Sequence, residues 1–409
     1  QLKLPPIEYI SREESLAIET NEFLNGTKAY DLMLAAGKAI ATHVKQINPS
    51  NILILCGSGN NGGDGIVAAN LLSPDFRVTL VLIKKPKTAE AIQAYHDLNK
   101  KRVKIVKINK NTKVESIYKL MENSDLIIDS LIGIGLKSTV KGTYQEIINK
   151  FSELHNTHIC SVDIPSGLDC NTGEWLCTPY APSSVVTMEF LKAGLQTLDP
   201  NCDIKVAPIG ISVEAGHMVG KGHFIHFWPK RALSSHKGEN GRIIVIGGSD
   251  GFPGAPVLSG MSALRTGVDT LRIAVPETIR NIVAGFAKDF IILKVKGDKI
   301  TSKGFNRFKD LTVNRHDVVT VGMGLSNHPE CIKFVLELFE HVKGKIKIVL
   351  DADAIRAFKG KLDLLKGSGA IITPHRAELR MMLEQEIPED PQDLITFLEA
   401  IALDLGIVI

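Results

Sequence analysis

The sequence is poor in cysteine, and its cysteines are not arranged as a redox or metal motif. The 409 residues include six cysteines, which form no Cys-x-x-Cys pair, and no His-Glu-x-x-His motif is present. Scattered single cysteines in a chain of this size are typical of a reducing compartment. The missing motifs also argue against a transition-metal site. We therefore expect a cytoplasmic protein that holds no transition metal.

Long apolar runs and runs of like charge are missing as well. The longest apolar stretches are well short of the roughly 20 residues of a membrane-spanning helix, and the first residues, QLKLPPIEYI, contain no apolar signal region. The 48 basic and 45 acidic residues give a net charge of +3, which provides no argument for nucleic-acid binding. We expect a soluble globular protein of about two or three domains that binds neither membranes nor nucleic acid.

Glycine, by contrast, is concentrated in one segment. Residues 52–56 predict a buried parallel strand and residues 66–72 predict the first turns of a helix, and GSGNNGGDG at 57–65 lies between them. Glycine permits positive φ and a close approach of ligand, and the N–H groups at a helix N-terminus bind anions. We interpret the segment as a phosphate-binding turn, in preference to a turn whose glycines serve packing alone.

The same segment contains the dinucleotide fingerprint Gly-x-Gly-x-x-Gly, from Gly57 to Gly62. This match is weak by itself, because a hydride-transferring Rossmann fold also needs an acidic residue after the next strand to bind the ribose. Here the next predicted strand, 78–83, is followed by Lys84 and Lys85. The pattern argues against an ordinary NAD dehydrogenase.

Polar or glycine-rich loops follow three apolar strand patterns in the first half of the chain, at 57–65, 129–137 and 163–169. In an open α/β sheet ligands bind at the carboxyl ends of the strands, so we expect the three loops to form one site. Asp129 and Asp163 each follow a strand directly, and the alternative for Asp129 is a helix N-cap.

The loops are rich in hard oxygen ligands. Asn60, Asn61 and Asp64 accompany the two aspartates. Carboxylate, amide and carbonyl oxygens suit a monovalent or alkaline-earth cation better than zinc. The sequence therefore favours a cation of that class near this site.

A second α/β pattern begins after a glycine-rich boundary at 211–235. An apolar strand pattern at 242–246 leads into a glycine-rich turn and a helix pattern at 257–266. Three later strand patterns, the last of them at 370–372, also lead into polar loops. The final residues, 407–409, are predicted to start a further strand. We predict an α/β protein with domains at 1–218 and 219–409.

The motifs of the first half resemble the YjeF N-terminal family of NAD(P)H-hydrate epimerases. They are GSGNNGGDG at 57–65, DSLIGIGL at 129–136 and VDIPSGLD at 162–169. From about residue 222 the chain resembles the ribokinase-like, ADP-dependent NAD(P)H-hydrate dehydratases. The motifs there are HKGENGRIIVIGGS at 236–249, GMGL at 322–325, DADA at 351–354 and TPHRAE at 373–378. The order of the halves is similar to that of the bifunctional NAD(P)H-hydrate repair enzymes.

This resemblance implies both a fold and an activity. It implies an N-terminal Rossmann-like three-layer αβα domain followed by a ribokinase-like α/β domain. The first would interconvert the R and S forms of the hydrated cofactors NADHX and NADPHX, and the second would dehydrate the S form at the expense of ADP. The implied cofactors are K⁺ and ADP, with Mg²⁺ as a further candidate, and we expect a homo-oligomer.

The resemblance also implies site residues. Asp163 is the candidate proton carrier and Lys192 a second candidate, for which the alternative is an ordinary solvated lysine. Epimerase substrate contacts are expected at Asn60, Asn61, Gly62, Gly63, Asp64, Gly133, Ile134, Gly135, Leu136, Lys137, Ser138, Thr139 and Asp163, and K⁺ ligands at Asn61, Asp129 and Ser166. Dehydratase substrate contacts are expected at Ala255, Gly324, His375, Arg376, Ala377 and Glu378, with a structural histidine as the alternative for His375.

Some positions depart from the family pattern. Ile134 replaces the usual threonine, Leu34 replaces a usual glutamate, and the adenine-nucleotide loop and GTGD motif of the second domain would lie beyond Ile409. We therefore expect an incomplete dehydratase half in a bifunctional repair enzyme. One alternative is an epimerase whose second domain only binds or assembles. The least favoured hypothesis is a ribokinase-like sugar kinase fused to a Rossmann-like domain.

Overall fold

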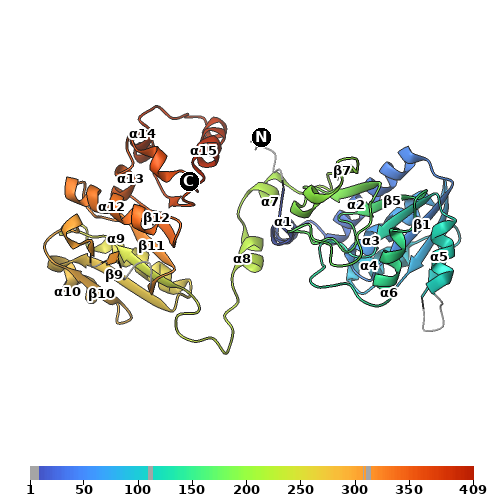
Figure 1. The fold of residues 1–409 in the computed structure, drawn as a ribbon, viewed down its shortest axis with the longest axis horizontal. Coiled ribbons are helices and arrows are strands. Elements are labelled where there is room, and N and C mark those ends of the chain that lie inside the picture. The colour runs from blue at the N-terminus through green and yellow to red at the C-terminus, as the bar shows by residue number, and fades with distance from the viewer. Residues whose placement is uncertain (1–8, 109–113, 307, 310–314) are drawn as a thin grey trace. The chain divides into compact units, whose positions relative to one another are not determined.

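The computed structural model of the chain describes residues 9–108, 114–306, 308–309 and 315–409 (Figure 1). Two compact units meet in the chain at Pro229 and Lys230. The expected boundary at 218/219 falls before helix α8 (Lys221–Phe227), which packs against α1 (Arg12–Leu24) of the first unit. Within the described residues, no helix has the length and apolar character needed to cross a membrane.

The first unit is built on a seven-stranded parallel sheet with strand order β3-β2-β1-β4-β5-β6-β7. The order reverses direction between β1 and β4, which is where α/β sheets bind ligands. The strands are β1 (Asn51–Cys56), β2 (Arg77–Leu82), β3 (Lys104–Lys107), β4 (Leu126–Ser130), β5 (His158–Val162), β6 (Ser184–Met188) and β7 (Asp203–Ala207).

Alternate side chains of β1 enter two separate hydrophobic cores. Ile52 and Ile54 pack with residues of α2 and α3, whereas Leu53 and Leu55 pack with residues of α5 and α6. This period of two places helices on both faces of the sheet, so the unit is the predicted three-layer αβα structure. Its other helices are α2 (Ala29–Ile47), α3 (Asn60–Leu72), α4 (Ala89–Asp97), α5 (Val114–Glu122), α6 (Thr143–Phe151), η1 (Ala193–Thr197) and α7 (Val213–His217).

The second unit contains a six-stranded parallel sheet with strand order β10-β9-β8-β11-β12-β13. The strands are β8 (Arg242–Ile246), β9 (Thr270–Pro276), β10 (Ile291–Val295), β11 (Val318–Val321), β12 (Lys347–Leu350) and β13 (Ile371–Ile372). The helices are α9 (Gly254–Arg265), η2 (Glu277–Ile279), α10 (Arg280–Ala284), η3 (Ser302–Gly304), α12 (Pro329–Val342), α13 (Asp353–Arg356), η4 (Leu362–Leu365), α14 (Arg376–Leu383) and α15 (Pro391–Leu405).

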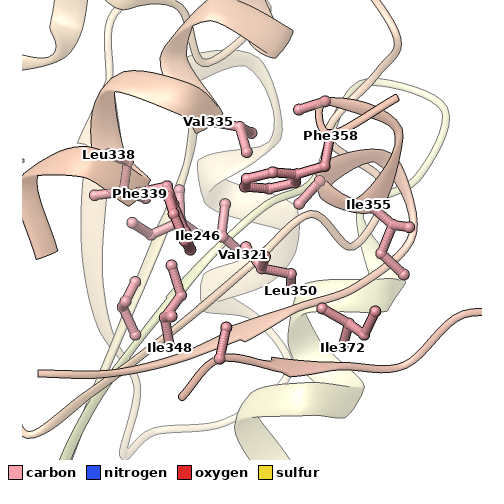
Figure 2. Packing of buried hydrophobic residues seen from close by; sticks show 14 of the residues in the cluster. Ile246, Val321, Val335, Leu338, Phe339, Ile348, Leu350, Ile355, Phe358 and Ile372 are labelled. Carbon is pink, nitrogen blue, oxygen red and sulfur yellow. The ribbon is translucent and has the colours of Figure 1, made fainter. Parts of the chain in front are cut away.

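The core of the second unit joins neighbouring strands to α12 (Figure 2). Ile246, Val321 and Leu350 come from three adjacent strands and lie in one buried cluster with Phe339 and Phe358. The two phenylalanine rings meet edge to face, with centroids 4.9 Å apart.

The end of the described chain lies beside β13. The strand predicted at 407–409 appears only as a bridge of Val408 to Ile371, with a 2.9 Å hydrogen bond from the Ile372 N–H to the Val408 carbonyl. Apart from this short segment, the parallel α/β character of both units agrees with the prediction.

Candidate functional site

A cavity of about 500 Å³ lies in the first unit, at the carboxyl ends of β1 and β4. Its walls include residues 58–61, residues 131–135 and Asp163, so all three predicted loops contribute to it. Helices α1 and α2 supply much of the remaining wall, together with Thr88, Tyr144, Met188 and Ile209. A larger hollow, of about 600 Å³, lies over α2, α3 and α4 and contains none of the predicted site residues. We take the first cavity as the candidate active site, because its position matches the reversal of strand order.

The glycine-rich segment differs from the prediction, since α3 begins at Asn60 and not near residue 66. Gly62, Gly63 and Gly65 therefore lie inside the helix. A Cβ at Gly62 would be 2.2 Å from the Gly57 carbonyl oxygen, and one at Gly63 would be 2.4 Å from Met33 Cε. Close packing of α3 thus accounts for these glycines, which is the alternative that the sequence analysis set aside.

The start of α3 still fits an anion. Gly59 is the N-cap and makes no side-chain cap, and a Cβ placed on it would meet nothing within 4 Å. Ser58, Gly59, Asn60 and Asn61 all line the cavity. The first N–H groups of a helix have no intrahelical acceptor, so this end of the cavity offers donors to a phosphate.

Asp163 and Lys192 form a buried ion pair. The Lys192 ammonium is 2.7 Å from Asp163 Oδ1 and also donates to the Met188 carbonyl at 2.7 Å. The Lys192 side chain is only 1% exposed, whereas that of Asp163 is 13% exposed and lines the cavity. The alternative of a solvated lysine is therefore wrong.

Asp129 lies within β4, fully buried, so the N-cap alternative is also wrong. Its carboxylate accepts hydrogen bonds from the Ser166 hydroxyl at 2.6 Å and the Ser166 N–H at 2.8 Å, and from the hydroxyls of Tyr180 and Ser161. Burial raises the pKa of Asp129, and the hydrogen bonds from Ser166 and Tyr180 oppose this effect.

The three residues expected to bind K⁺ surround one short loop. Ser166 Oγ accepts a hydrogen bond from the Ile132 N–H at 2.9 Å, and a Cβ at Gly133 would be 3.0 Å from Asn61 Oδ1. The buried amide nitrogen of Asn61 has no hydrogen-bond partner among the described residues. Asp129 has no ion pair with any residue that the structure describes. A buried carboxylate without a counter-charge, next to neutral oxygens, fits a monovalent cation.

Across the described ranges, no group of three or more histidine, cysteine, aspartate or glutamate side chains is arranged to hold a metal ion.

The other predicted substrate contacts are divided. Gly133, Ile134 and Gly135 line the cavity together with Asn60, Asn61 and Asp64. Leu136 packs against the core next to α5 and α6. Three further predicted contacts are exposed loop residues that do not line the cavity: Lys137, Ser138 and Thr139. Gly62 and Gly63 are buried in α3 and do not line it either.

Sequence reasoning missed Glu19, which lies on α1 and lines the cavity. Its pKa is raised to about 7, chiefly by burial and also by the negative charge of Asp163, while Lys192 opposes the rise. Burial also raises the pKa of Asp64 well above its ordinary value, and Asp163 and Glu19 add to this effect. No local pattern marks Glu19, because α1 reads as an ordinary structural helix.

In the second unit, the predicted residues follow strands of one sheet. Ala255 is the second residue of α9, after β8, and Gly324 follows β11 with φ +62°. His375 is the N-cap of α14, where its Nδ1 accepts from the Glu378 N–H at 3.3 Å and Glu378 accepts from the His375 N–H at 3.0 Å. The His375 ring is 66% exposed. Arg376 and Ala377 form the first turn of α14.

Side chains connect these strand ends. Asp351 accepts from the Thr373 hydroxyl at 2.7 Å, and Asp353 accepts from the Ser326 N–H at 2.8 Å. The loops after β11, β12 and β13 are therefore held together at one edge of the sheet.

Comparison with known proteins gives two family matches. The family described as YjeF-related protein N-terminus matches residues 29–194, and the family described as NAD(P)H-hydrate dehydratase matches residues 243–409. A crystal structure of the ADP/ATP-dependent NAD(P)H-hydrate dehydratase from Bacillus subtilis, co-crystallised with ATP and Mg²⁺, is 23% identical, with a TM-score of 0.34. It covers 44% of this chain and 61% of that one.

Relatives extend across both units. A Pyrobaculum aerophilum protein named bifunctional NAD(P)H-hydrate repair enzyme Nnr is 32% identical, covering 98% of this chain and 81% of that protein. An Archaeoglobus fulgidus protein of the same name is 34% identical, covering 91% and 76% respectively. The chain therefore belongs to the family of bifunctional NAD(P)H-hydrate repair enzymes.

Proposed function

We propose that the first unit interconverts the R and S forms of hydrated NADH and NADPH, and that the second unit dehydrates the S form at the expense of ADP. The observation that carries the first half is the cavity that joins the Asp163–Lys192 pair to the open start of α3. The two family matches, in this order along one chain, support both halves.

The chemistry of a hydrated dihydronicotinamide suits such a cavity. Water adds to the ring double bond with its oxygen on the carbon bonded to the ring nitrogen, so the two epimers differ at a carbon that the nitrogen lone pair can activate. Exchange of the hydroxyl between faces needs a group that gives a proton and a group that takes one. Asp163, paired with Lys192, is a carboxylate suited to take the proton. The dinucleotide phosphates would bind the N–H groups at the start of α3.

Potassium would be held by Asn61, Asp129 and Ser166. When bound, the ion supplies the positive charge that the buried Asp129 carboxylate lacks. The three residues come from the start of α3, the carboxyl end of β4 and the loop after β5, so a bound ion would link these three segments beside the cavity. Cytoplasmic location and homo-oligomer formation remain predictions from the sequence.

For the second unit, the proposal assigns substrate contacts to Ala255, Gly324 and the start of α14 at His375–Glu378. These residues lie after the carboxyl ends of strands in one sheet, where α/β folds bind ligands. ADP or ATP would serve as the phosphate donor, as the name of the Bacillus subtilis dehydratase says of that protein. The match to residues 243–409 favours this bifunctional proposal over an epimerase whose second unit only binds.

Recovery of NADH absorbance from a prepared mixture of R and S hydrates tests both halves. The chain is assayed with ADP, with ATP and without nucleotide, and Asp163→Asn provides the matched control. The bifunctional proposal predicts full recovery with a nucleotide and none without it, in contrast to the incomplete dehydratase half expected from the sequence. With Asp163→Asn, only the S portion should recover rapidly.

The results that would contradict the proposal distinguish the dehydratase activity from the epimerase activity. If no hydrate is recovered under any condition, the dehydratase assignment is wrong for this chain. An intact separate dehydratase is then added. Consumption of the R form no faster than its spontaneous epimerisation would refute the epimerase assignment as well.

A further inference from the structure

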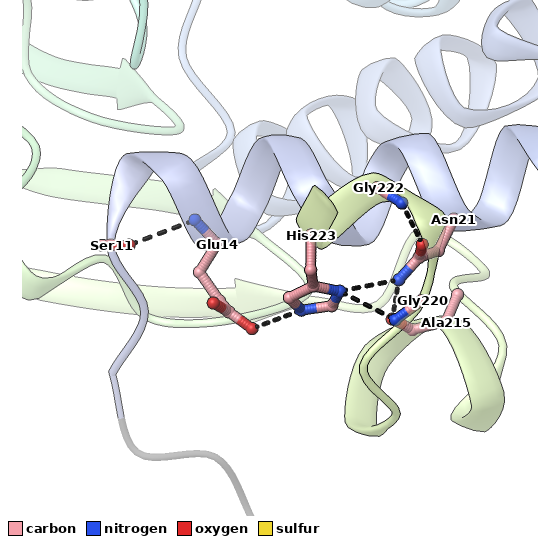
Figure 3. Close-up of polar contacts among 7 residues, drawn as sticks. All are labelled: Ser11, Glu14, Asn21, Ala215, Gly220, Gly222 and His223. Atoms are coloured by element: carbon pink, nitrogen blue, oxygen red, sulfur yellow. Dashed lines mark hydrogen bonds and ion pairs between the residues drawn. The ribbon is translucent and has the colours of Figure 1, made fainter. Parts of the chain in front are cut away.

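Helix α1 has two faces with different partners. Glu14 and Asn21 contact α8 (Figure 3), and Ala17, three residues after the first and four before the second, approaches α8 through its carbonyl oxygen. His223 of α8 is 2.9 Å from Glu14 through Nε2, and Asn21 accepts from the Gly222 N–H at 2.8 Å. A Cβ at Gly222 would be 2.1 Å from the Ala17 carbonyl oxygen, so the two helices are in close contact. This contact fixes the rotation of α1 about its axis.

The opposite face of α1 lines the cavity with Leu16, Glu19 and Phe23, at the same helical spacing. Glu19 is therefore a carboxyl group that a rigidly held helix presents to the candidate active site between two apolar side chains. Among the described residues, the Glu19 carboxyl group has no hydrogen bond and no ion pair. A carboxyl group without a partner in such surroundings is retained at a cost in stability, which points to a role toward a ligand.

The cavity holds more acidic than basic side chains. Glu19, Asp64 and Asp163 line one cavity, and Lys192 is the cation that pairs with one of them. Three ionised carboxylates in a confined space repel one another, so protons remain on those without a counter-charge. Asp163 has the lysine, and Glu19 does not.

We propose, resting on the epimerase function proposed above, that Glu19 is the proton donor of the cavity and that Asp163, paired with Lys192, is the proton acceptor. The two residues reach the cavity from different elements, α1 and the end of β5.

The electrostatics agree with this assignment. Burial raises the pKa of Glu19 to about 7, so a large fraction of Glu19 carries a proton at neutral pH. The titratable side chains that α8 presents to α1 contact other residues: His223 is 2.9 Å from Glu14, and His226 is 2.9 Å from Thr20.

The bond between the ring carbon and its hydroxyl oxygen breaks, the ring nitrogen lone pair forms a C=N bond, and the proton of Glu19 converts the departing hydroxide into water. Water then adds to the other face of that carbon, the C=N electron pair returns to nitrogen, and the excess proton passes to Asp163. A proton transfer from Asp163 to Glu19 restores the starting state.

The test uses the whole chain and a hydrate preparation enriched in the R form. An excess of a separate dehydratase specific for the S form makes epimerisation rate-limiting at each pH, and NADH absorbance reports the rate. The variants are Glu19→Gln, which removes the proton, and Glu19→Asp, which keeps a carboxyl group. Glu13→Gln is the matched control, because Glu13 lies on the same helix but bonds Asn171 outside the cavity.

We expect kcat/KM of the unmodified chain to fall as the pH rises through about 7, because Glu19 then loses its proton. Glu19→Gln should lower kcat/KM about 10²- to 10⁴-fold, the usual range for loss of an acid–base group, and should remove this pH dependence. Glu19→Asp should keep a descending limb, and Glu13→Gln should match the unmodified chain.

Two outcomes would overturn the inference alone: Glu19→Gln with unchanged rate and pH profile, or an unmodified chain with no descending limb between about pH 6 and 8. The second needs no variant, so it decides the matter even where Glu19→Gln does not fold. If the unmodified chain does not accelerate consumption of the R form at all, the epimerase function itself is refuted, and this inference with it.

Discussion

At the scale of single residues, the candidate site depends on buried charges and on how each is compensated. Asp163 adopts a left-handed backbone conformation, with φ +63°, which costs a non-glycine residue about 1–2 kcal/mol. Its carboxylate is compensated by Lys192, by the Thr187 hydroxyl and by the Met188 N–H, the last two at 3.2 Å. Asp129 instead has only neutral donors. Asp163 should therefore be sensitive to loss of its lysine partner, and Asp129 to the presence of a bound cation.

Removal of the lysine from the buried pair should destabilise the first unit. Lys192→Met leaves Asp163 without a counter-charge, and breaking a buried pair in this way typically costs about 3–5 kcal/mol. We expect a loss near the lower end, because Asp163 is partly open to the cavity. Denaturant unfolding measures it. Lys205→Met is the control: its pair with Asp203 is exposed, so the change should stay within about 1 kcal/mol. Equal effects of the two variants would contradict the prediction.

Potassium should stabilise the first unit through Asp129. We expect a higher Tm in KCl than in LiCl at equal ionic strength, because a bound K⁺ compensates a carboxylate that lacks a cationic partner within the described part of the chain. Asp129→Asn removes the charge and should abolish the difference between the salts. Calorimetry checks this without any assay of activity. A salt difference that survives in Asp129→Asn would place the ion elsewhere.

At the scale of elements, strands were predicted more accurately than helix ends. The predicted strand at 52–56 corresponds to β1 at Asn51–Cys56, and that at 242–246 to β8 at Arg242–Ile246. Strands of a parallel sheet are apolar on both faces, and this pattern is visible in a short window. The start of α3 was misplaced because glycine has a low helix propensity, so its first turn forms only through tertiary packing against β1 and α2.

The glycines of α3 should therefore differ in their tolerance of alanine. Gly62→Ala forces a Cβ to within 2.2 Å of a backbone oxygen, which cannot move away as a flexible side chain can. We expect a loss of about 1–3 kcal/mol or more. Gly59→Ala meets nothing within 4 Å and keeps an extended φ of −97°, so its effect on stability should be within about 0.5 kcal/mol. Unfolding curves of both variants test the contrast, and similar losses would mean that conformation, not packing, selects glycine here.

At the scale of the whole molecule, the sequence predicted two α/β units and one meeting point of three loops, but not the full lining of the cavity. The loops follow from the rule that parallel strands end at one edge. The position of Glu19 does not follow from this rule, because it depends on contacts between segments that are far apart in the sequence. The Ile10 N–H donates to the Leu191 carbonyl, and α8 packs on α1, so segments far apart in the sequence together carry α1 to the cavity. The boundary predicted at 218/219 would separate α8 from this contact.

The pH dependence of stability should show that Glu19 is retained for function. Its folded-state pKa, about 7, is above the ordinary value, so the folded state binds more protons than the unfolded state between about pH 4.5 and 7. The first unit should accordingly lose stability as the pH rises through that range. His43 and His158 act in the opposite sense: burial lowers their pKa values, so stability falls as the pH drops below about 6.5.

Glu19→Gln should therefore make the first unit more stable at pH 8, by about 1–3 kcal/mol, and leave it little changed at pH 5. Hydrogen–deuterium exchange of peptides from β1, β4 and β5 resolves this unit from the other. Glu13→Gln, on the same helix, should show no such gain. A Glu19→Gln protein that is less stable at pH 8 would mean that the carboxylate contributes to folding. A gain in stability together with a loss of epimerisation would mean that the protein keeps an unpaired acid at this position because its reaction requires one.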